Sequence, residues 1–158
     1  MKSNNSSILN TVNTLLSNEE IDWQQLLDSV VSGFDCATGT LHFLDEKTEL
    51  LQVQAHIGVP DFLLPKLATI PVGKGMAGIA AERKKPVEMC TLQTDSSGVA
   101  RPAAKETKVE GSIAAPLMLD EVLYGVIGIG KQVPYDFTVA ETQELMAIGE
   151  AISGVLKK

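Results

Sequence analysis

The chain has 158 residues, of which 44% are hydrophobic and 21% charged, and this balance indicates a folded domain rather than a disordered chain. Its formal net charge of −7 argues against nucleic acids and anionic membranes as partners, because affinity for both depends on Lys and Arg. No apolar run reaches membrane-spanning length and no secretory signal is recognisable, so we expect a cytoplasmic protein.

Apolar spacing in the first part of the chain predicts two helices. Residues 8–16 carry the stripe of an amphipathic helix, within an N-terminal segment of residues 1–19. Asp22 and Gln25 have the spacing of a capping box and predict the start of a second helix. We expect residues 20–158 to form one domain without internal repeats.

The middle of the chain changes to short β-type runs. Residues 38–45 and 50–57 predict a hairpin with one solvated face. Pro65 allows only a brief helical segment over residues 61–67, because proline interrupts the helical pattern. Residues 87–89 predict a further short strand.

The second half of the chain combines a long loop, a hairpin and a helix. Residues 91–109 are polar and lack periodicity, so we interpret them as a surface loop that could act as a lid. Residues 112–119 and 122–130 predict a second hairpin, in which Pro116 indicates a bulge or a strand edge. A capping box at Thr138 predicts a long amphipathic helix up to the end of the chain.

A glycine-rich turn is the most distinctive local motif. It matches the GxGxxG pattern of dinucleotide-binding loops, but that interpretation requires a buried strand immediately before the motif, where Pro65 and Pro71 bracket only five residues. We therefore interpret the glycines as a tight turn that opens a short helix. The first N–H groups of such a helix could hold a carboxylate or a phosphate. The residues of the motif are Gly73, Lys74, Gly75, Met76, Ala77 and Gly78.

Other ligating or reactive side chains are isolated in the sequence. His42 and His56 have no carboxylate or thiol at ligand spacing, so we interpret them as ordinary strand histidines. Cys36 and Cys90 form neither a CxxC pair nor a Cys/His cluster. Cys90 is a candidate redox thiol for which the local sequence offers no base. We expect no metal and no cofactor.

Three glycines interrupt the apolar run of residues 122–130, at Gly125, Gly128 and Gly130. Glycine weakens a strand unless another group approaches its backbone closely. Helix packing is one explanation, and a ligand lying against the strand is the other. Gly125 is therefore included among the candidate ligand-binding residues.

An ordered series of motifs resembles the GAF domain family. The resemblance covers roughly residues 20–156 and rests on residues 70–78, 80–82, 85–87, 111–117, 123–129 and 137–138. It implies an α+β, PAS-like fold with a central antiparallel sheet of five to six strands. The N- and C-terminal helices would pack on one face of this sheet, and a loop-covered ligand pocket would lie on the other.

The resemblance also implies a non-catalytic sensory or regulatory domain that signals through its terminal helices. Its ligand would be a small metabolite that could be anionic, bound by the glycine-rich motif, by Gly125 and by Arg101 as a second cation beside Lys74.

Two alternatives stay open. The first is a homodimerising interaction module with a vestigial pocket, in which the stripes of residues 8–16 and 145–155 pair across a two-fold axis. The second is an enzyme similar to free methionine-(R)-sulfoxide reductase that uses Cys90. The enzymes of that branch resemble one another in a cysteine inside the glycine-rich motif, where this chain has Ala77.

Overall fold

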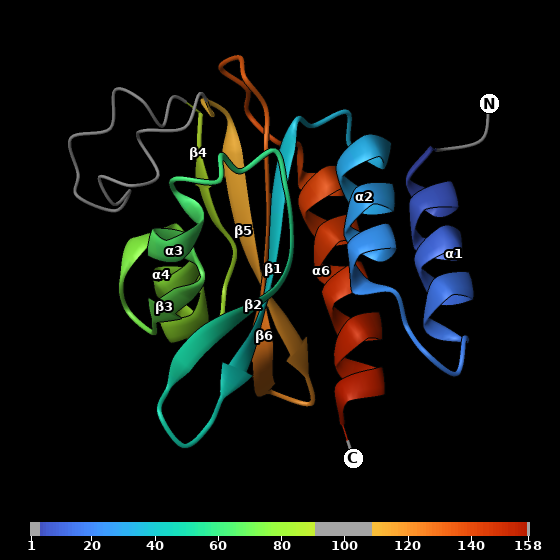
Figure 1. Cartoon of the computed structure of the whole chain (residues 1–158). Coiled ribbons are helices and arrows are strands. Elements are labelled where there is room, and N and C mark those ends of the chain that lie inside the picture. The colour runs from blue at the N-terminus through green and yellow to red at the C-terminus, as the bar shows by residue number, and fades with distance from the viewer. Residues whose placement is uncertain (1–3, 91–108, 158) are drawn as a thin grey trace.

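One antiparallel sheet organises the protein. The computed structural model describes residues 4–90 and 109–157, with side chains described from Ile8 onward. Within these residues, six strands follow the order β3-β2-β1-β6-β5-β4 (Figure 1). The elements in chain order are α1 (Asn4–Leu16), α2 (Trp23–Gly33), β1 (Thr38–Asp45), β2 (Leu50–Ile57), α3 (Leu64–Leu67), β3 (Thr69–Pro71), α4 (Gly75–Arg83), β4 (Val87–Met89), β5 (Ser112–Leu119), β6 (Val122–Gly130) and α6 (Val139–Leu156). The expected α+β architecture with a central antiparallel sheet is confirmed.

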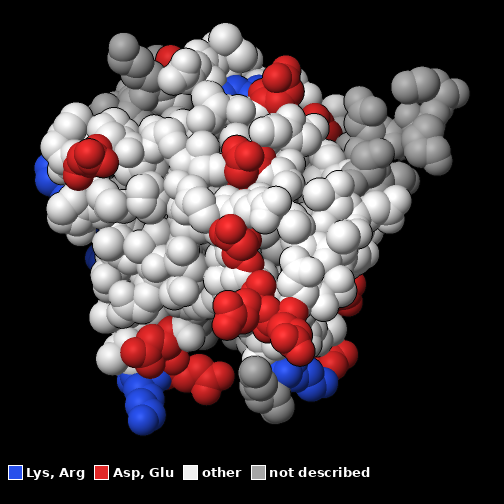
Figure 2. All heavy atoms as spheres, turned by 45° about the vertical axis from the view of Figure 1, so that its right-hand side comes forward, with Lys and Arg blue, Asp and Glu red and all other residues white. Residues whose placement is uncertain are grey.

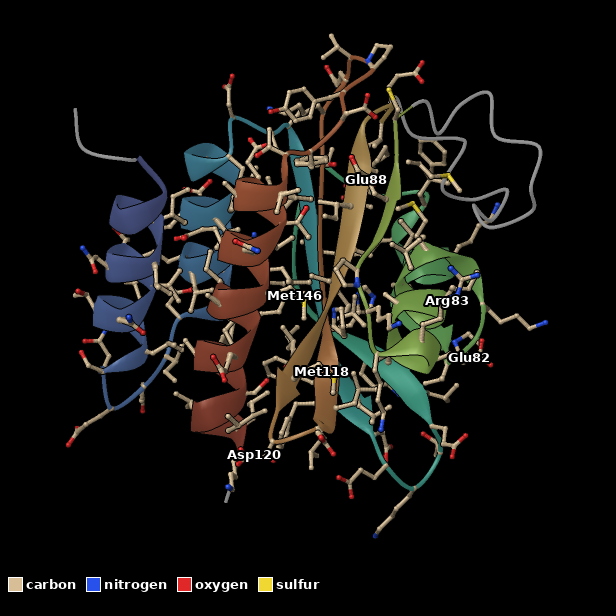
Figure 3. The ribbon with its side chains drawn as sticks, turned by 180° about the vertical axis from the view of Figure 1, so that it is seen from behind. Glu82, Arg83, Glu88, Met118, Asp120 and Met146 are labelled. Carbon is tan, nitrogen blue, oxygen red and sulfur yellow. The ribbon has the colours of Figure 1, made fainter. Side chains whose placement is uncertain are left out.

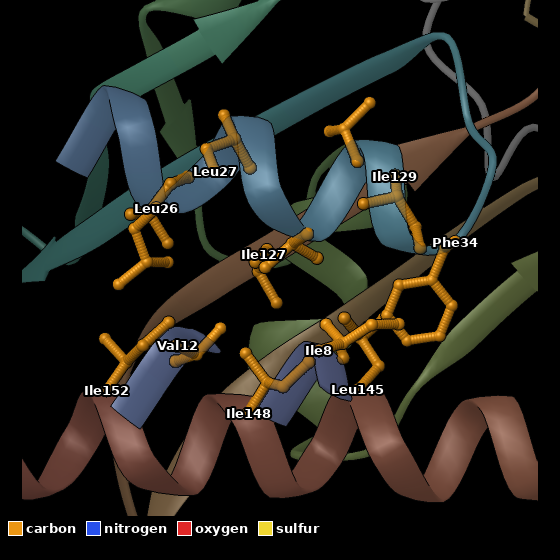
Figure 4. Packing of buried hydrophobic residues seen from close by; sticks show 14 of the residues in the cluster. Ile8, Val12, Leu26, Leu27, Phe34, Ile127, Ile129, Leu145, Ile148 and Ile152 are labelled. Carbon is orange, nitrogen blue, oxygen red and sulfur yellow. The ribbon is translucent and has the colours of Figure 1, made fainter. Parts of the chain in front are cut away.

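Helices α1, α2 and α6 form a layer on one face of the sheet (Figure 1). The start of α2 is capped as predicted, because the Asp22 side chain accepts the N–H of Gln25 at 3.0 Å. Leu26 of α2, Ile148 of α6 and Ile127 of β6 have no exposed surface and belong to one core (Figure 4). Burying a side chain of this size stabilises the fold by about 1.5–3 kcal/mol, so this core supplies much of the stability.

The helical stripes of the interaction-module hypothesis are used inside the chain. Ile8 and Val12 of α1 are 5% and 0% exposed, and Leu145, Ile148 and Ile152 of α6 are at most 1% exposed. These five side chains already pack in the chain's own core, so they are not free to pair across a two-fold axis. A dimer through the terminal helices would have to use their outer faces.

The opposite face of the sheet is covered by α3 and α4 (Figure 1). Leu51, Ile70 and Val126 form a second, smaller core beneath α4. Strand β3 was not predicted, because three residues that end in Pro71 carry too little pattern to show a strand. The two edge strands, β3 and β4, have three residues each, and such short edges limit pairing with other chains.

Pro116 lies in the part of β5 that has a neighbouring strand on one side only. Strand β4 pairs only with residues 112–114 of β5, so no strand covers that side of β5 at Pro116. A proline is tolerated there because its missing N–H has no ladder partner to lose. The register with β6 also shifts between Leu117 and Met118. The edge and the irregularity that Pro116 indicated are both confirmed.

Candidate functional site

A cavity of about 140 Å³ lies between the sheet and α4. Strand β1 contributes Thr38, Thr40 and His42, whose side chains share one face because they alternate along the strand. Apolar side chains such as Leu67 and Met76 complete the walls. The expected pocket on the face opposite the helix layer is present, with a mostly apolar lining and a few polar groups. This is the usual character of a small-molecule site.

Gly128 leaves room on the sheet side of the cavity. A Cβ atom there would meet Thr40 Oγ1 at 3.4 Å and the Ile113 carbonyl oxygen at 3.8 Å, which are ordinary contacts. Packing within the described chain therefore does not require glycine at this position. The missing side chain instead opens space above β6.

Gly125 has a different role. A Cβ atom at Gly125 would overlap the carbonyl oxygen of His42 in the neighbouring strand β1. The close approach that requires this glycine comes from β1, not from a helix, and Gly125 is not among the residues that line the cavity.

The amino end of α4 opens onto the cavity. Lys74 is its N-cap residue and provides no side-chain hydrogen bond to the helix. The N–H of Gly78 donates to the Lys74 carbonyl oxygen at 3.0 Å, so it is not available to a ligand. The N–H groups of Gly75, Met76 and Ala77 have no acceptor among the described residues. All three residues line the cavity, as does Lys74.

The glycines of the motif form the turn that orients the amino end of α4. Gly73 and Gly75 adopt positive φ angles of 96° and 67°, which other residues rarely take. The N–H of Gly73 donates to the Gly78 carbonyl oxygen at 2.7 Å and closes the turn. A Cβ atom at Gly78 would overlap the Pro71 carbonyl oxygen. Gly73 and Gly78 therefore support the site without lining it.

His42 is a buried polar side chain at the cavity, with 1% of its surface exposed. Its Nε2 lies 2.8 Å from the carbonyl oxygen of Leu67. Burial lowers the pKa of the imidazole, and the hydrogen bond to Leu67 opposes this shift only in part. The ring is therefore held in its neutral form at neutral pH.

The structure brings together only part of the predicted site. Lys74, Gly75, Met76 and Ala77 meet at the cavity, whereas Arg101 and most of the predicted lid lie outside the described residues. Sequence reasoning missed the polar side of the cavity, formed by Thr38, Thr40, His42 and Ser112. The signal was the run of polar residues at every second position of β1, in a strand whose intervening Leu41 is fully buried.

Neither cysteine is placed or tuned for thiol chemistry at this cavity. Burial raises the pKa of Cys36 to about 11, and desolvation together with the carboxylate of Asp136 raises the pKa of Cys90. A thiol with a raised pKa stays protonated and is a weak nucleophile. Neither residue lines the cavity. Within the described residues, no group of His, Cys, Asp and Glu is arranged to hold a metal ion, and no helix is long and apolar enough to cross a membrane.

Comparisons with known proteins give one consistent family. Residues 23–157 match the GAF domain family. No curated protein sequence gave a match. The GAF domain of an Acinetobacter phosphoenolpyruvate-protein phosphotransferase superposes with a TM-score of 0.79 at 17% identity, over 99% of this chain and 94% of that one.

Two further solved structures have the same fold. The free methionine-R-sulfoxide reductase from Neisseria meningitidis, in complex with its substrate, superposes with a TM-score of 0.78 at 16% identity, covering 97% of this chain and 88% of that one. The GAF domain of A. aeolicus nlh2 in an inactive state gives a TM-score of 0.77 at 18% identity, covering 98% and 96%. At these identities the likeness concerns the fold.

Proposed function

Because the chain belongs to the GAF domain family, we propose that it is a non-catalytic sensory domain that binds a small anionic molecule in the cavity beside α4. The observation that carries this proposal is the uncapped amino end of α4, where three N–H groups open onto the cavity. A helix amino end bears a partial positive charge, so it favours a carboxylate or a phosphate. Lys74 adds a full positive charge at the same end of the cavity.

The size and lining of the cavity narrow the ligand further. About 140 Å³ suits a small molecule, and the apolar side chains of Leu67, Ile70 and Val109 favour an apolar body on it. The ligand would therefore place its anionic end at α4 and its apolar part against the sheet above Gly128.

The segment between β6 and α6 makes hydrogen bonds that support signalling from the cavity to the terminal helices. Glu110, next to the cavity residue Val109, donates its N–H to the Lys131 carbonyl oxygen at 2.8 Å. The Lys131 ammonium donates to the carbonyl oxygens of Phe34 and Asp35, both at 2.9 Å, where α2 ends. One residue thus contacts both the cavity side and α2.

The same connection reaches α6. The N–H of Tyr135 donates to the Cys90 carbonyl oxygen at 3.2 Å, and its hydroxyl donates to the Glu141 carboxylate at 2.8 Å. Glu141 also accepts the N–H of Thr138 in the capping box that begins α6. Glu88, labelled near the top of the sheet in Figure 3, accepts the N–H of Phe137. A movement of the residues beside the cavity would therefore be transmitted through these hydrogen bonds to the first turn of α6.

The first test is native mass spectrometry of the protein as purified from cells. We expect a retained small anion, which is identified after release by denaturation. The matched variant is Gly128→Val, because the position has room for a side chain and valine suits a strand while filling the cavity. Equal retention by this variant would place the molecule elsewhere and contradict the proposal.

A second pair of variants tests the helix end directly. Met76→Pro removes one of the three free N–H groups, and proline is accepted in the first turn of a helix. Met76→Ala removes the same side chain but keeps the N–H. Anion affinity should fall by about tenfold more in Met76→Pro than in Met76→Ala, if one charge-assisted hydrogen bond is lost. Equal affinities would exclude the helix end as the anion site.

The reductase alternative has no comparable support. It requires a reactive thiol beside the bound substrate, whereas Cys36 and Cys90 both have raised pKa values and lie outside the cavity lining. The likeness to reductase structures rests on the shared fold.

A further inference from the structure

The hydroxyl of Thr40 is a polar group that faces the cavity. Its Oγ1 lies 3.4 Å from the position that a Cβ atom of Gly128 would occupy. That position is on the cavity side of the sheet, because side chains alternate along β6: Val126 packs in the small core beneath α4, and Ile127 packs in the core beneath the helix layer. Thr40 and Gly128 both line the cavity. The hydroxyl therefore lies above the bare backbone of β6, on the side that the ligand would occupy.

This hydroxyl is free and accessible. It makes no hydrogen bond to another described residue, and it is not one of the described side-chain polar atoms that are both unpaired and buried. An unpaired atom outside that group has exposed surface, so a molecule in the cavity can reach it. The two other hydroxyls of the cavity differ. Ser112 already donates to the Ile129 carbonyl oxygen at 3.4 Å, and Thr38 places its Oγ1 over Gly130, which does not line the cavity.

Full charges are scarce around the cavity. Among the described residues that line it, Lys74 is the only Lys, Arg, Asp or Glu. An ammonium group on the ligand would find no carboxylate there, so its loss of hydration would not be compensated. An ammonium next to the anionic group would also face Lys74 and the positive end of α4. A polar substituent on the ligand is therefore favoured only if it is uncharged.

We propose that the ligand is a small acid with an uncharged oxygen substituent, a hydroxyl or a carbonyl, which forms a hydrogen bond with the Thr40 hydroxyl while the anionic group is held at the amino end of α4. This inference rests on the proposed function, since it concerns the same cavity. The Thr40 hydroxyl can donate and accept, so it serves either substituent. The ligand class is a hydroxy acid or an oxo acid, and the amino acid with the same skeleton is rejected.

The experiment uses matched small acids as probes. Acids that share a carbon skeleton and are unsubstituted or carry a hydroxyl, a carbonyl or an amino group at C2, C3 or C4 are titrated into the full chain by calorimetry. We expect at least one hydroxy or oxo acid to bind about fivefold or more tightly than the unsubstituted acid, which is the effect of one hydrogen bond. The matching amino acid should bind more weakly than both.

The variant Thr40→Val removes the hydroxyl and keeps a β-branched side chain that suits a strand. It should bind the substituted and the unsubstituted acid equally, and Thr40→Ser should keep the preference. Without acid, Thr40→Val should be no less stable than the parent in urea, because the hydroxyl has no partner to lose. The control is Thr69→Val, since the Thr69 hydroxyl donates to Gln52 Oε1 at 2.9 Å outside the cavity.

A carbon-13 NMR measurement on the parent protein keeps the test independent of how the variants fold. With labelled threonine methyl groups, the Thr40 signal should shift more on addition of the preferred acid than on addition of the unsubstituted acid. The Thr69 signal serves as the internal control and should not move.

The possible results separate this inference from the proposed function. Equal binding of substituted and unsubstituted acids, or binding of the amino acid as tight as that of the hydroxy acid, would overturn the inference and leave anion binding at α4 intact. A preference for the oxygen substituent that survives in Thr40→Val would overturn the assignment to Thr40. Binding of none of the acids would overturn the proposed function and this inference with it.

Discussion

The buried imidazole of His42 links the cavity to the pH dependence of stability. Its folded-state pKa is lowered by burial from the ordinary value of 6.5, so the unfolded chain takes up a proton more readily. Stability therefore falls as the pH drops below 6.5, because protonation favours the unfolded state.

The variant His42→Gln should lose this part of the acid sensitivity. Glutamine does not titrate and keeps an N–H that can reach the Leu67 carbonyl oxygen. The difference in free energy of unfolding between about pH 7.5 and about pH 5, measured with urea, should be smaller in the variant than in the parent. His56→Gln is the control, and an equal reduction in that variant would contradict the role of His42.

Glu144 on α6 should make stability depend on pH in the opposite direction from His42. Desolvation raises the pKa of its carboxyl, and a hydrogen bond from the Leu9 backbone opposes this only in part, while Oε2 is buried without a partner among the described residues. The ionised form is therefore unfavourable in the fold. Glu144→Gln should increase the free energy of unfolding slightly at neutral pH, and the gain should vanish at a pH where Glu144 is protonated. Glu150→Gln, on the exposed side of the same helix, is the control.

At the scale of elements, two glycines of β6 should respond oppositely to a side chain. Gly125→Ala forces a Cβ atom against the His42 carbonyl oxygen and should cost about 1–3 kcal/mol of stability. Gly128→Ala meets only ordinary contacts and should leave stability within about 0.5 kcal/mol of the parent or raise it. Denaturant unfolding of the two variants checks this, and equal losses would show that the strand tolerates neither.

The ammonium group of Lys131 contacts both the end of α2 and the ring of Tyr135. It donates to the carbonyl oxygens of Phe34 and Asp35 and lies 4.5 Å from the centre of the Tyr135 ring. Lys131→Met should lower the free energy of unfolding by about 1–3 kcal/mol, because two carbonyl oxygens at the end of α2 lose a charged donor.

The control for Lys131 is another lysine on the surface. Lys157 pairs with Asp120 at 3.2 Å, but the two side chains are 56% and 70% exposed. Lys157→Met should therefore change stability by less than about 1 kcal/mol. If both variants lose the same free energy of unfolding in urea, the Lys131 ammonium does not hold the end of α2.

Local patterns predicted most elements but only half of the site. The helix caps at Asp22 and Thr138 and the two hairpins depend on neighbouring residues, and the structure has them within a few positions. The role of His42 could not be predicted in this way, because its partner Leu67 lies 25 residues further along the chain. The face of the sheet that holds the cavity was predicted from the resemblance to the GAF family and not from local patterns, because helices cover both faces (Figure 1).

At the scale of the whole molecule, the two sides of the sheet differ in charge. Helices α1, α2 and α6 contain Asp28, Glu141, Glu144 and Glu150 but no Lys or Arg. Figure 2 turns this side toward the viewer and shows basic groups only near its edges. Arg83 lies on the opposite side, at the end of α4 (Figure 3). Two copies that met through their helix layers would bring like charges together.

This separation gives the expected homodimer a definite salt dependence. Self-association through the outer faces of the helices should strengthen as salt screens the acidic groups, and sedimentation velocity at low and high ionic strength measures it. Gly154 on α6 is exposed, and a Cβ atom added there would meet nothing within 4 Å, so Gly154→Trp should leave the monomer folded but abolish such a dimer. Association that weakens with salt would instead indicate head-to-tail contact between the acidic helices and the basic end of α4, and Gly154→Trp combined with Arg83→Glu would separate the two arrangements.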